Sequence, residues 1–133
     1  MNSTGSGYRK QTGNEGEAEA RAFLEQKGYR ILEQNWRYGQ GEIDLIARDG
    51  QVMVFIEVKT KKHEGFGEPE DWIGRRKQNQ IGRLALGYLQ KKNLENIECR
   101  FDVVTVDKTG PAAAVNHIED AFWIDSRAAW RMF

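Results

Sequence analysis

The sequence predicts an α/β domain, a mixed β-sheet with helices covering its faces, and three patterns support this fold class. Two runs rich in Ile, Val, Leu and Phe flank Asp49-Gly50, a dipeptide that readily forms the tight turn of an antiparallel hairpin. Apolar residues recur at helical spacing in residues 14–27 and 75–92. A further strand pattern covers residues 100–107. We therefore expect the hairpin at the centre of the sheet.

The hairpin separates its side chains onto two faces, because neighbouring residues of a strand point to opposite sides. With Asp49 and Gly50 as the two loop residues, Asp44 lies opposite Phe55. One face is then apolar throughout, with Ile43, Leu45, Ala47, Val52, Val54, Ile56 and Val58. The other is apolar near the turn, at Ile46, Met53 and Phe55, and charged at the open end, at Glu42, Asp44, Glu57 and Lys59.

The charged end of the hairpin has the composition of a metal site. Asp44 and Glu57 are predicted diagonal neighbours, roughly 7–8 Å apart along the backbones, and such carboxylates repel unless a cation lies between them. Hard oxygen ligands favour Mg²⁺ or Mn²⁺ over Zn²⁺, and Lys59 on the same face reaches the same point. Together these groups predict phosphodiester hydrolysis, with Lys59 steering water or neutralising developing charge. The alternative is a solvated strand face with weak ion pairs.

The same residues resemble a known family. Gly41-Glu42-Ile43-Asp44-Leu45-Ile46-Ala47 and Phe55-Ile56-Glu57-Val58-Lys59 are similar to the D…E-x-K core of restriction-endonuclease-like nucleases, a group that includes Holliday junction resolvases. With Gly16-Glu17, Phe66-Gly67, Lys77 and Arg100-Phe101-Asp102-Val103-Val104, the chain resembles the small, uncharacterised YraN-like bacterial proteins over residues 14–123. The resemblance implies a nuclease-like fold acting on nucleic acid.

The resemblance also implies roles for individual residues. Asp44 and Glu57 would hold the metal, the carbonyl of Val58 would complete its shell, and Glu42 and Glu17 would be supporting acids. For Glu17 the alternative is a stabilising charge in the first turn of its helix. Lys61 stands where the YraN-like pattern usually has arginine, so the charge is kept but the bidentate fork is lost.

Composition narrows the class of protein. The chain has 133 residues, 39% of them hydrophobic, which fits one globular domain over residues 14–133 after a polar lead-in at residues 1–13. Its 20 basic and 20 acidic residues give no net charge, so nucleic-acid binding requires local segregation of charge. A single cysteine, Cys99, fits a reducing cytoplasm and a structural role. No run is long enough to span a membrane, and we expect a cytoplasmic protein.

Charge segregation is clearest in the helix predicted over residues 75–92. Ile81, Leu84 and Tyr88 belong to its apolar stripe, and it contains no acidic residue. We predict that it contacts phosphates, together with Lys61, and that the partner is DNA or structured nucleic acid. The predicted contacts are Lys61, Arg75, Arg76, Lys77 and Arg83. A solvated basic helix face is the alternative.

The remaining segments are less specific. A helix over residues 14–27 packs through Ala20 and Leu24, and a strand over residues 29–37 leads into the hairpin. In the strand over residues 100–107, Asp102 is a supporting acid or an ion-pair partner of Arg100. A last strand and a short helix are expected within residues 117–133, whose aromatic end packs on the domain or forms a homodimer contact. A non-catalytic nucleic-acid-binding module and an interaction protein are the rival functions.

Overall fold

The computed structural model describes residues 16–62 and 73–124. A five-stranded sheet has the spatial order β1-β2-β3-β4-β5. The strands are β1 (Arg30–Tyr38), β2 (Gly41–Asp49), β3 (Val52–Lys61), β4 (Cys99–Asp107) and β5 (Ala114–Ile118). β3 and β4 are parallel and are connected through α2 (Arg75–Lys91), whereas all other neighbours are antiparallel. The predicted mixed α/β sheet with a central hairpin is confirmed.

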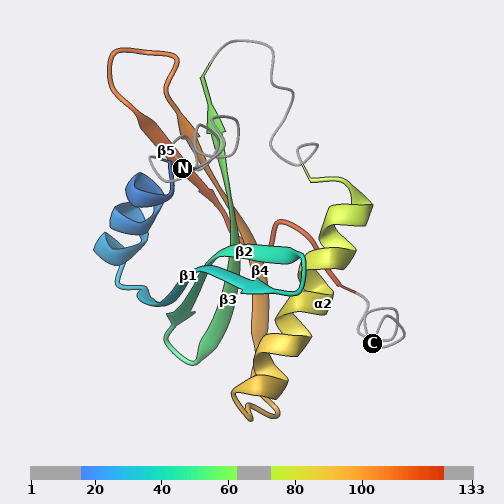
Figure 1. The fold of residues 1–133 in the computed structure, drawn as a ribbon. Coiled ribbons are helices and arrows are strands. Elements are labelled where there is room, and N and C mark those ends of the chain that lie inside the picture. The colour runs from blue at the N-terminus through green and yellow to red at the C-terminus, as the bar shows by residue number, and fades with distance from the viewer. Residues whose placement is uncertain (1–15, 63–72, 125–133) are drawn as a thin grey trace, which may run out of the picture.

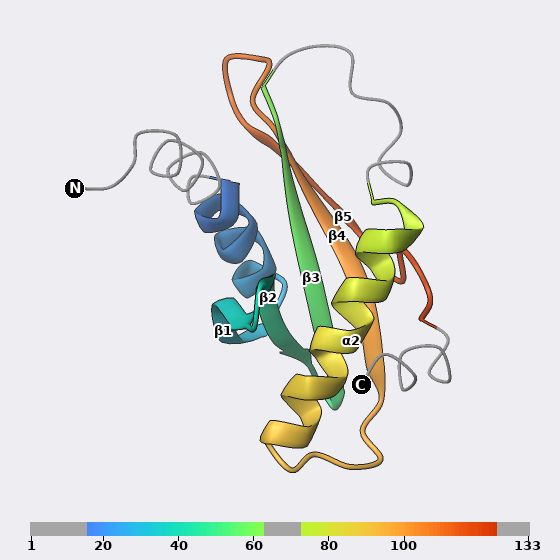
Figure 2. The same cartoon turned by 45° about the vertical axis from the view of Figure 1, so that its right-hand side comes forward.

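One helix covers each face of the sheet (Figure 1). The described part of the N-terminal helix, residues 16–26, buries Ala20 and Leu24 against the even-numbered residues of β3, including Val54 and Ile56. On the opposite face, α2 buries Leu84, Ala85 and Tyr88 against Met53 and Phe55. Figure 2 shows the sheet between the two helices. The helical and strand periodicities of the sequence therefore identified both core faces correctly.

The predicted register of the central hairpin is wrong by two residues. Asp49 remains in β2 and faces Val52, and Ile46 rather than Asp44 lies opposite Phe55. The loop residues are Gly50, with φ of 63°, and Gln51, an arrangement typical of a type II′ turn with glycine first. Asp49 is retained in the strand by Arg100, whose Nη1 lies 3.2 Å from Asp49 Oδ2. A shift of two does not by itself move a side chain to the other face.

Ile43 is the exception to the predicted faces. It packs with Ile46 on the α2 side, whereas Leu45 and Ala47 pack on the side of the N-terminal helix. On β1, Asn35 adopts a left-handed backbone with φ of 55°, between the paired positions Gln34 and Trp36. This local break in the pleat changes which residues point to each face at the open end of the hairpin.

Further predictions concern the last strand, Cys99, the ends of the chain and membrane spans. The last strand is β5, which begins at Ala114 rather than at or after His117. Burial raises the pKa of the Cys99 thiol to about 11, which agrees with a structural rather than a nucleophilic role. Residues 1–15, the loop at 63–72 with Phe66, and the tail at 125–133 lie outside the described residues. Neither of the described helices has the length and apolar character needed to cross a membrane.

Candidate active site

The predicted site lies where β2 separates from β3. The pairing of these strands ends at Leu45 and Ile56, while β2 continues alongside β1 and β3 continues alongside β4. The backbone N–H of Val58 is thereby left without a partner strand on the β2 side. It donates instead to Oδ2 of Asp44 at 2.8 Å. The carboxylate of Asp44 therefore takes the place of a ladder hydrogen bond, which fixes it beside Glu57.

Glu57 points toward the opposite side of the gap, where α2 begins. Its side chain is 7% exposed, and its Oε2 lies 3.7 Å from Nζ of Lys59 and 3.6 Å from Nζ of Lys77. Lys59 is two residues further along β3, on the same face. Lys77 comes from the first turns of α2. The structure thus brings the predicted E-x-K residues together and adds Lys77 to them.

Glu17 approaches from the N-terminal helix. The preceding Gly16 lies against Thr60 of β3 so closely that any side chain at position 16 would collide with the threonine hydroxyl. This close approach places Glu17 in the same region, with only 6% of the residue exposed. Among the described residues, none donates a hydrogen bond to its buried Oε1. A buried acceptor without a donor is costly, so the atom is available to a ligand.

Electrostatics links four acids, which we call the acid cluster: Glu17, Glu42, Asp44 and Glu57. Burial raises the pKa of Asp44 well above its usual range, and the charges of Glu57, Glu17 and Glu42 raise it further, against the lowering effect of the Val58 N–H. Burial also raises the pKa of Glu17, and Glu42 adds to that rise, whereas polar groups of Asn35, Asp44 and Gln34 offset part of it. A nearby cation would counter the rise in the pKa of both Asp44 and Glu17.

The acid cluster suits Mg²⁺ or Mn²⁺ better than Zn²⁺. Its donors are carboxylate oxygens, and Glu17 supplies a buried oxygen that accepts no hydrogen bond from the part of the chain that the structure describes. Within residues 16–62 and 73–124, however, no three His, Cys, Asp or Glu side chains already converge as a ready ligand group. Mg²⁺ commonly uses only one or two protein carboxylates together with water and phosphate oxygens. Asp44 and Glu57, with the carbonyl of Val58, fit that smaller requirement.

The residues predicted to contact phosphate are distributed over α2 and the end of β3. Arg75 and Arg76 are exposed at the beginning of α2, and Lys61 ends β3. Arg83 is half-buried further along α2. Lys77 is 42% exposed but lies within ion-pair distance of Glu57, so it belongs to the site as well as to the basic surface. Glu42, the remaining predicted acid, lies 3.9 Å from the guanidinium of Arg37.

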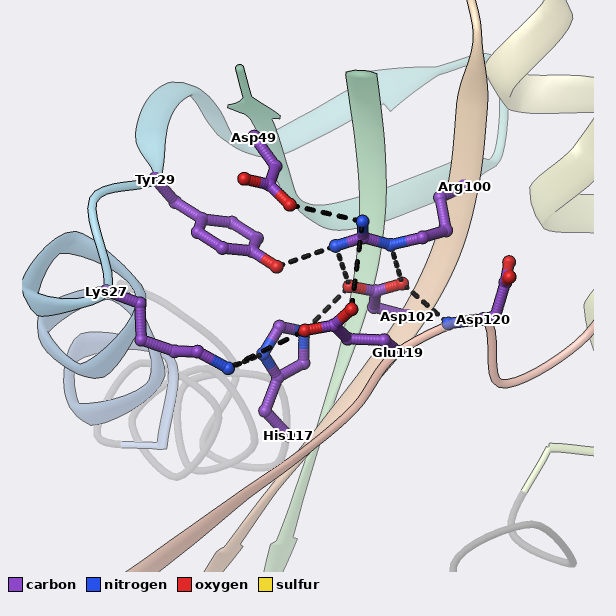
Figure 3. Close-up of polar contacts among 8 residues, drawn as sticks. All are labelled: Lys27, Tyr29, Asp49, Arg100, Asp102, His117, Glu119 and Asp120. Atoms are coloured by element: carbon purple, nitrogen blue, oxygen red, sulfur yellow. Dashed lines mark hydrogen bonds and ion pairs between the residues drawn. The ribbon is translucent and has the colours of Figure 1, made fainter. Parts of the chain in front are cut away.

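Asp102 belongs to a separate buried network, shown in Figure 3. It is fully buried and accepts hydrogen bonds from Arg100 at 3.0 Å, from Nε2 of His117 at 2.7 Å and from the backbone N–H of Asp120 at 3.0 Å. Burial alone would raise the pKa of Asp102, but the bonds from His117 and Arg100 outweigh it and hold that pKa low. The predicted ion pair with Arg100 is confirmed, and the structure does not place Asp102 with the acid cluster.

The network joins the end of the N-terminal helix to β4 and β5. Nζ of Lys27 lies 2.8 Å from Nδ1 of His117, and the hydroxyl of Tyr29 accepts from Arg100 at 2.6 Å. An ammonium has only donors, so Nδ1 accepts and Nε2 carries the proton donated to Asp102. These contacts hold the end of the helix whose beginning carries Glu17.

Sequence reasoning missed Asn35 and Gln34, whose side chains influence Glu17, and the network around His117. Asn35 carried a usable signal, because asparagine within a strand pattern is among the few residues that readily adopt positive φ. His117 and Lys27 carried none, since ninety positions separate them in the chain.

Comparison with known proteins gives a family. The family model described as "Uncharacterised protein family UPF0102" matches residues 16–106. A UPF0102 protein of Syntrophus aciditrophicus is 48% identical over 111 residues, covering 84% of this chain and 87% of the relative. UPF0102 proteins of Moorella thermoacetica and Geobacter sulfurreducens are 45% and 41% identical, covering 86% and 89% of this chain and 97% and 93% of their own lengths. The chain therefore belongs to the uncharacterised protein family UPF0102.

Proposed function

We propose that this protein is a Mg²⁺- or Mn²⁺-dependent endonuclease of the restriction-endonuclease-like superfamily, acting on DNA or structured nucleic acid in the cytoplasm. One observation carries the proposal. Asp44, Glu57 and Lys59 meet at the point where two central strands separate, beside a buried oxygen of Glu17 that accepts no hydrogen bond from the described residues. Burying several carboxylates together costs free energy of folding, and such clusters are found mainly at functional sites.

Each residue of the site has a role in this reaction. Asp44 and Glu57 would hold the ion with the carbonyl of Val58, while Glu17 and Glu42 add negative charge around it. The bound ion would polarise a phosphate oxygen and lower the pKa of a coordinated water. Lys59 orients the attacking water or stabilises the negative charge that develops on the phosphate. Lys77, whose Nζ lies 3.6 Å from Glu57, would stabilise the same developing negative charge from α2.

The beginning of α2 supports phosphate binding. A helix N-terminus carries partial positive charge, so acidic residues are favoured in its first turn. Here the first turn has no acidic residue, contains Arg75, Arg76 and Lys77, and follows Gly74, which provides no side-chain cap. Positive side chains at this position oppose the helix dipole at a cost of about 0.3–1 kcal/mol each. A bound phosphate would reverse that penalty, since free N–H groups and cations both favour an anion.

A second candidate is a nucleic-acid-binding module without turnover. The basic first turn of α2 favours it, and so does the lack of a ready three-ligand group among the described residues. The two functions share the binding surface and differ in whether Glu57 and Lys59 contribute to cleavage.

Cleavage assays with Glu57→Gln and Lys59→Met separate the two candidates. We expect each change to lower the rate of Mn²⁺-dependent cleavage of labelled DNA and RNA substrates by about 100-fold or more, because each removes a group that acts on the reacting phosphate. Affinity for the same nucleic acids in chelator should change by less than about threefold, or tighten when the charge of Glu57 is removed.

Glu95→Gln is the matched control, because Glu95 is an exposed acid in the loop after α2. It should cleave like the wild type. A contaminating nuclease would instead give equal cleavage in all of the preparations, because every variant is purified in the same way. Equal cleavage by Glu57→Gln, Lys59→Met and the wild type would refute the site. Tight binding without cleavage by the wild type would favour the binding module.

A further inference from the structure

An exposed aromatic side chain lies on β1, the strand that pairs with the Asp44 strand β2. Tyr38, at the end of β1, is 50% exposed, and with Trp123 it is one of two large exposed hydrophobic residues in the described chain. Its ring stacks on Trp36 with 5.8 Å between centroids and 4° between planes. Trp36 in turn meets the ring of Tyr88 edge-on at 5.2 Å. Tyr38 is therefore the outer member of a braced aromatic stack.

The stack is held rigidly from beneath. Tyr88 is 3% exposed, contacts Phe55 in the core and donates its hydroxyl to Glu33 at 3.2 Å. The position opposite Tyr38 on β2 is Gly41, which has no side chain to cover the ring. Gly41 is also packed against Leu84, and a Cβ there would lie 2.7 Å from Leu84 Cδ1. Leu84 of α2 thus fills the space beside Gly41, and Tyr38 still keeps half of its surface exposed.

The half-exposed ring of Tyr38 lies at a distance from the acid cluster that a few nucleotides can span. Gly41 precedes Asp44 by three residues on the same strand, which corresponds to roughly 10 Å. In a stacked strand, successive nucleotides are about 3.4 Å apart, so roughly three nucleotides span this distance. A strand with a phosphate at Asp44 would bring a nearby base to Tyr38.

We propose that Tyr38, braced by Trp36, is a stacking platform for an unpaired base, and that the preferred substrate carries such a base near the cleaved bond. This inference rests on the proposed action on nucleic acid. In a continuous duplex both faces of each base are covered by its neighbours, whereas a single strand or a bulge offers a free face to an aromatic side chain. The platform accepts any base, because every base has a π-face.

The test compares Tyr38→Ala with Tyr38→Phe, which keeps the stacking ring. Three fluorescein-labelled DNAs of one sequence serve as probes in chelator: a single strand, a duplex, and a duplex with one unpaired base. We expect Tyr38→Ala to weaken binding of the single strand and the bulge by about 5- to 150-fold, the value of one stacked base, and to change duplex binding less than about twofold. Tyr38→Phe should resemble the wild type.

A spectroscopic signal reports the contact itself. 2-Aminopurine at the unpaired position should lose fluorescence when wild type or Tyr38→Phe binds, and keep it with Tyr38→Ala. Equal weakening of all three DNAs, or no weakening, would overturn the platform while metal-dependent cleavage by the wild type still supports the nuclease. A changed oligomeric state of Tyr38→Ala with unchanged DNA binding would assign the ring to a protein contact and also overturn it. Absence of binding to any nucleic acid would overturn both proposals.

Discussion

The half-buried Asp44 and the buried Asp102 show how the same residue type serves opposite purposes. Asp44 accepts one backbone hydrogen bond, and burial together with its carboxylate neighbours raises its pKa well above the usual range. Asp102 accepts bonds from an arginine, a histidine and a backbone amide, and its pKa is lowered. Ionised Asp102 is thus fully compensated within the fold, whereas ionised Asp44 needs a further cation. Asp102 therefore stabilises the fold, whereas the charge of Asp44 is not balanced to the same extent by its neighbours.

Replacing Asp102 tests its structural role. Asp102→Asn should lower the free energy of unfolding by about 3 kcal/mol at neutral pH, because Arg100 is then left largely buried without its full countercharge. Asp49→Asn, which removes the half-exposed partner of the same guanidinium, should cost less than about 1 kcal/mol. Urea denaturation measures both.

The pH dependence has a definite sign. The folded-state pKa of Asp102 is below its unfolded value of about 3.9, so its contribution to stability is present above that value and is lost as pH falls below it. The difference in unfolding free energy between wild type and Asp102→Asn should therefore shrink below about pH 4. A difference that stays constant down to acid unfolding would contradict this origin of the stability.

At the scale of elements, α2 has two functions along one helix. Its buried stripe at Leu84, Ala85 and Tyr88 covers the sheet, while its first turn presents cations near the acid cluster. The N-terminal helix is divided in the same way, with Glu17 at its beginning and Lys27 fastened to His117 beyond its end. Each helix thus fixes a site residue by packing elsewhere along its length.

Charge reversal at the beginning of α2 tests its part in binding. Arg75→Glu with Arg76→Glu should weaken DNA binding in chelator by about tenfold or more. The slope of log affinity against log salt concentration should fall by the amount expected for the loss of about 1–2 phosphate contacts. Arg30→Glu with Lys91→Glu is a control of equal charge change, because both residues are exposed and Lys91 lies at the opposite end of α2. Identical salt slopes for the two double variants would show that net charge, rather than this turn, determines binding.

Over the whole molecule, the features set by local periodicity were predictable. The pattern of β3 identified both of its faces, and the stripe from Ile81 to Leu89 identified the buried side of α2. The hairpin register was not predictable, because Asp49 is held in β2 by Arg100, fifty-one positions away. The position of Asp44 depends on where β2 and β3 separate and on the left-handed backbone at Asn35, both of which are set by tertiary packing.

The sequence predicted most residues of the candidate site but not the position of every one of them. Spacing alone indicated Asp44, Glu57 and Lys59, because residues on one face of a hairpin meet at its open end whichever even register is adopted. Lys77 was assigned only to phosphate, since nothing in its own segment indicates that the helix turns it toward Glu57. Glu17 depended on resemblance, and the structure adds the physical reason through Gly16 and Thr60.

The central claim is that Asp44 holds a metal ion, and calorimetric titration of Mn²⁺ into wild type and Asp44→Asn tests it most directly. Asparagine keeps an oxygen for the Val58 N–H but removes the charge. The account predicts saturable binding by the wild type that weakens by about tenfold or more in the variant, and that weakens for the wild type as pH falls and protons compete for Asp44. Equal binding by both proteins, or none by the wild type with nucleic acid present, would contradict it.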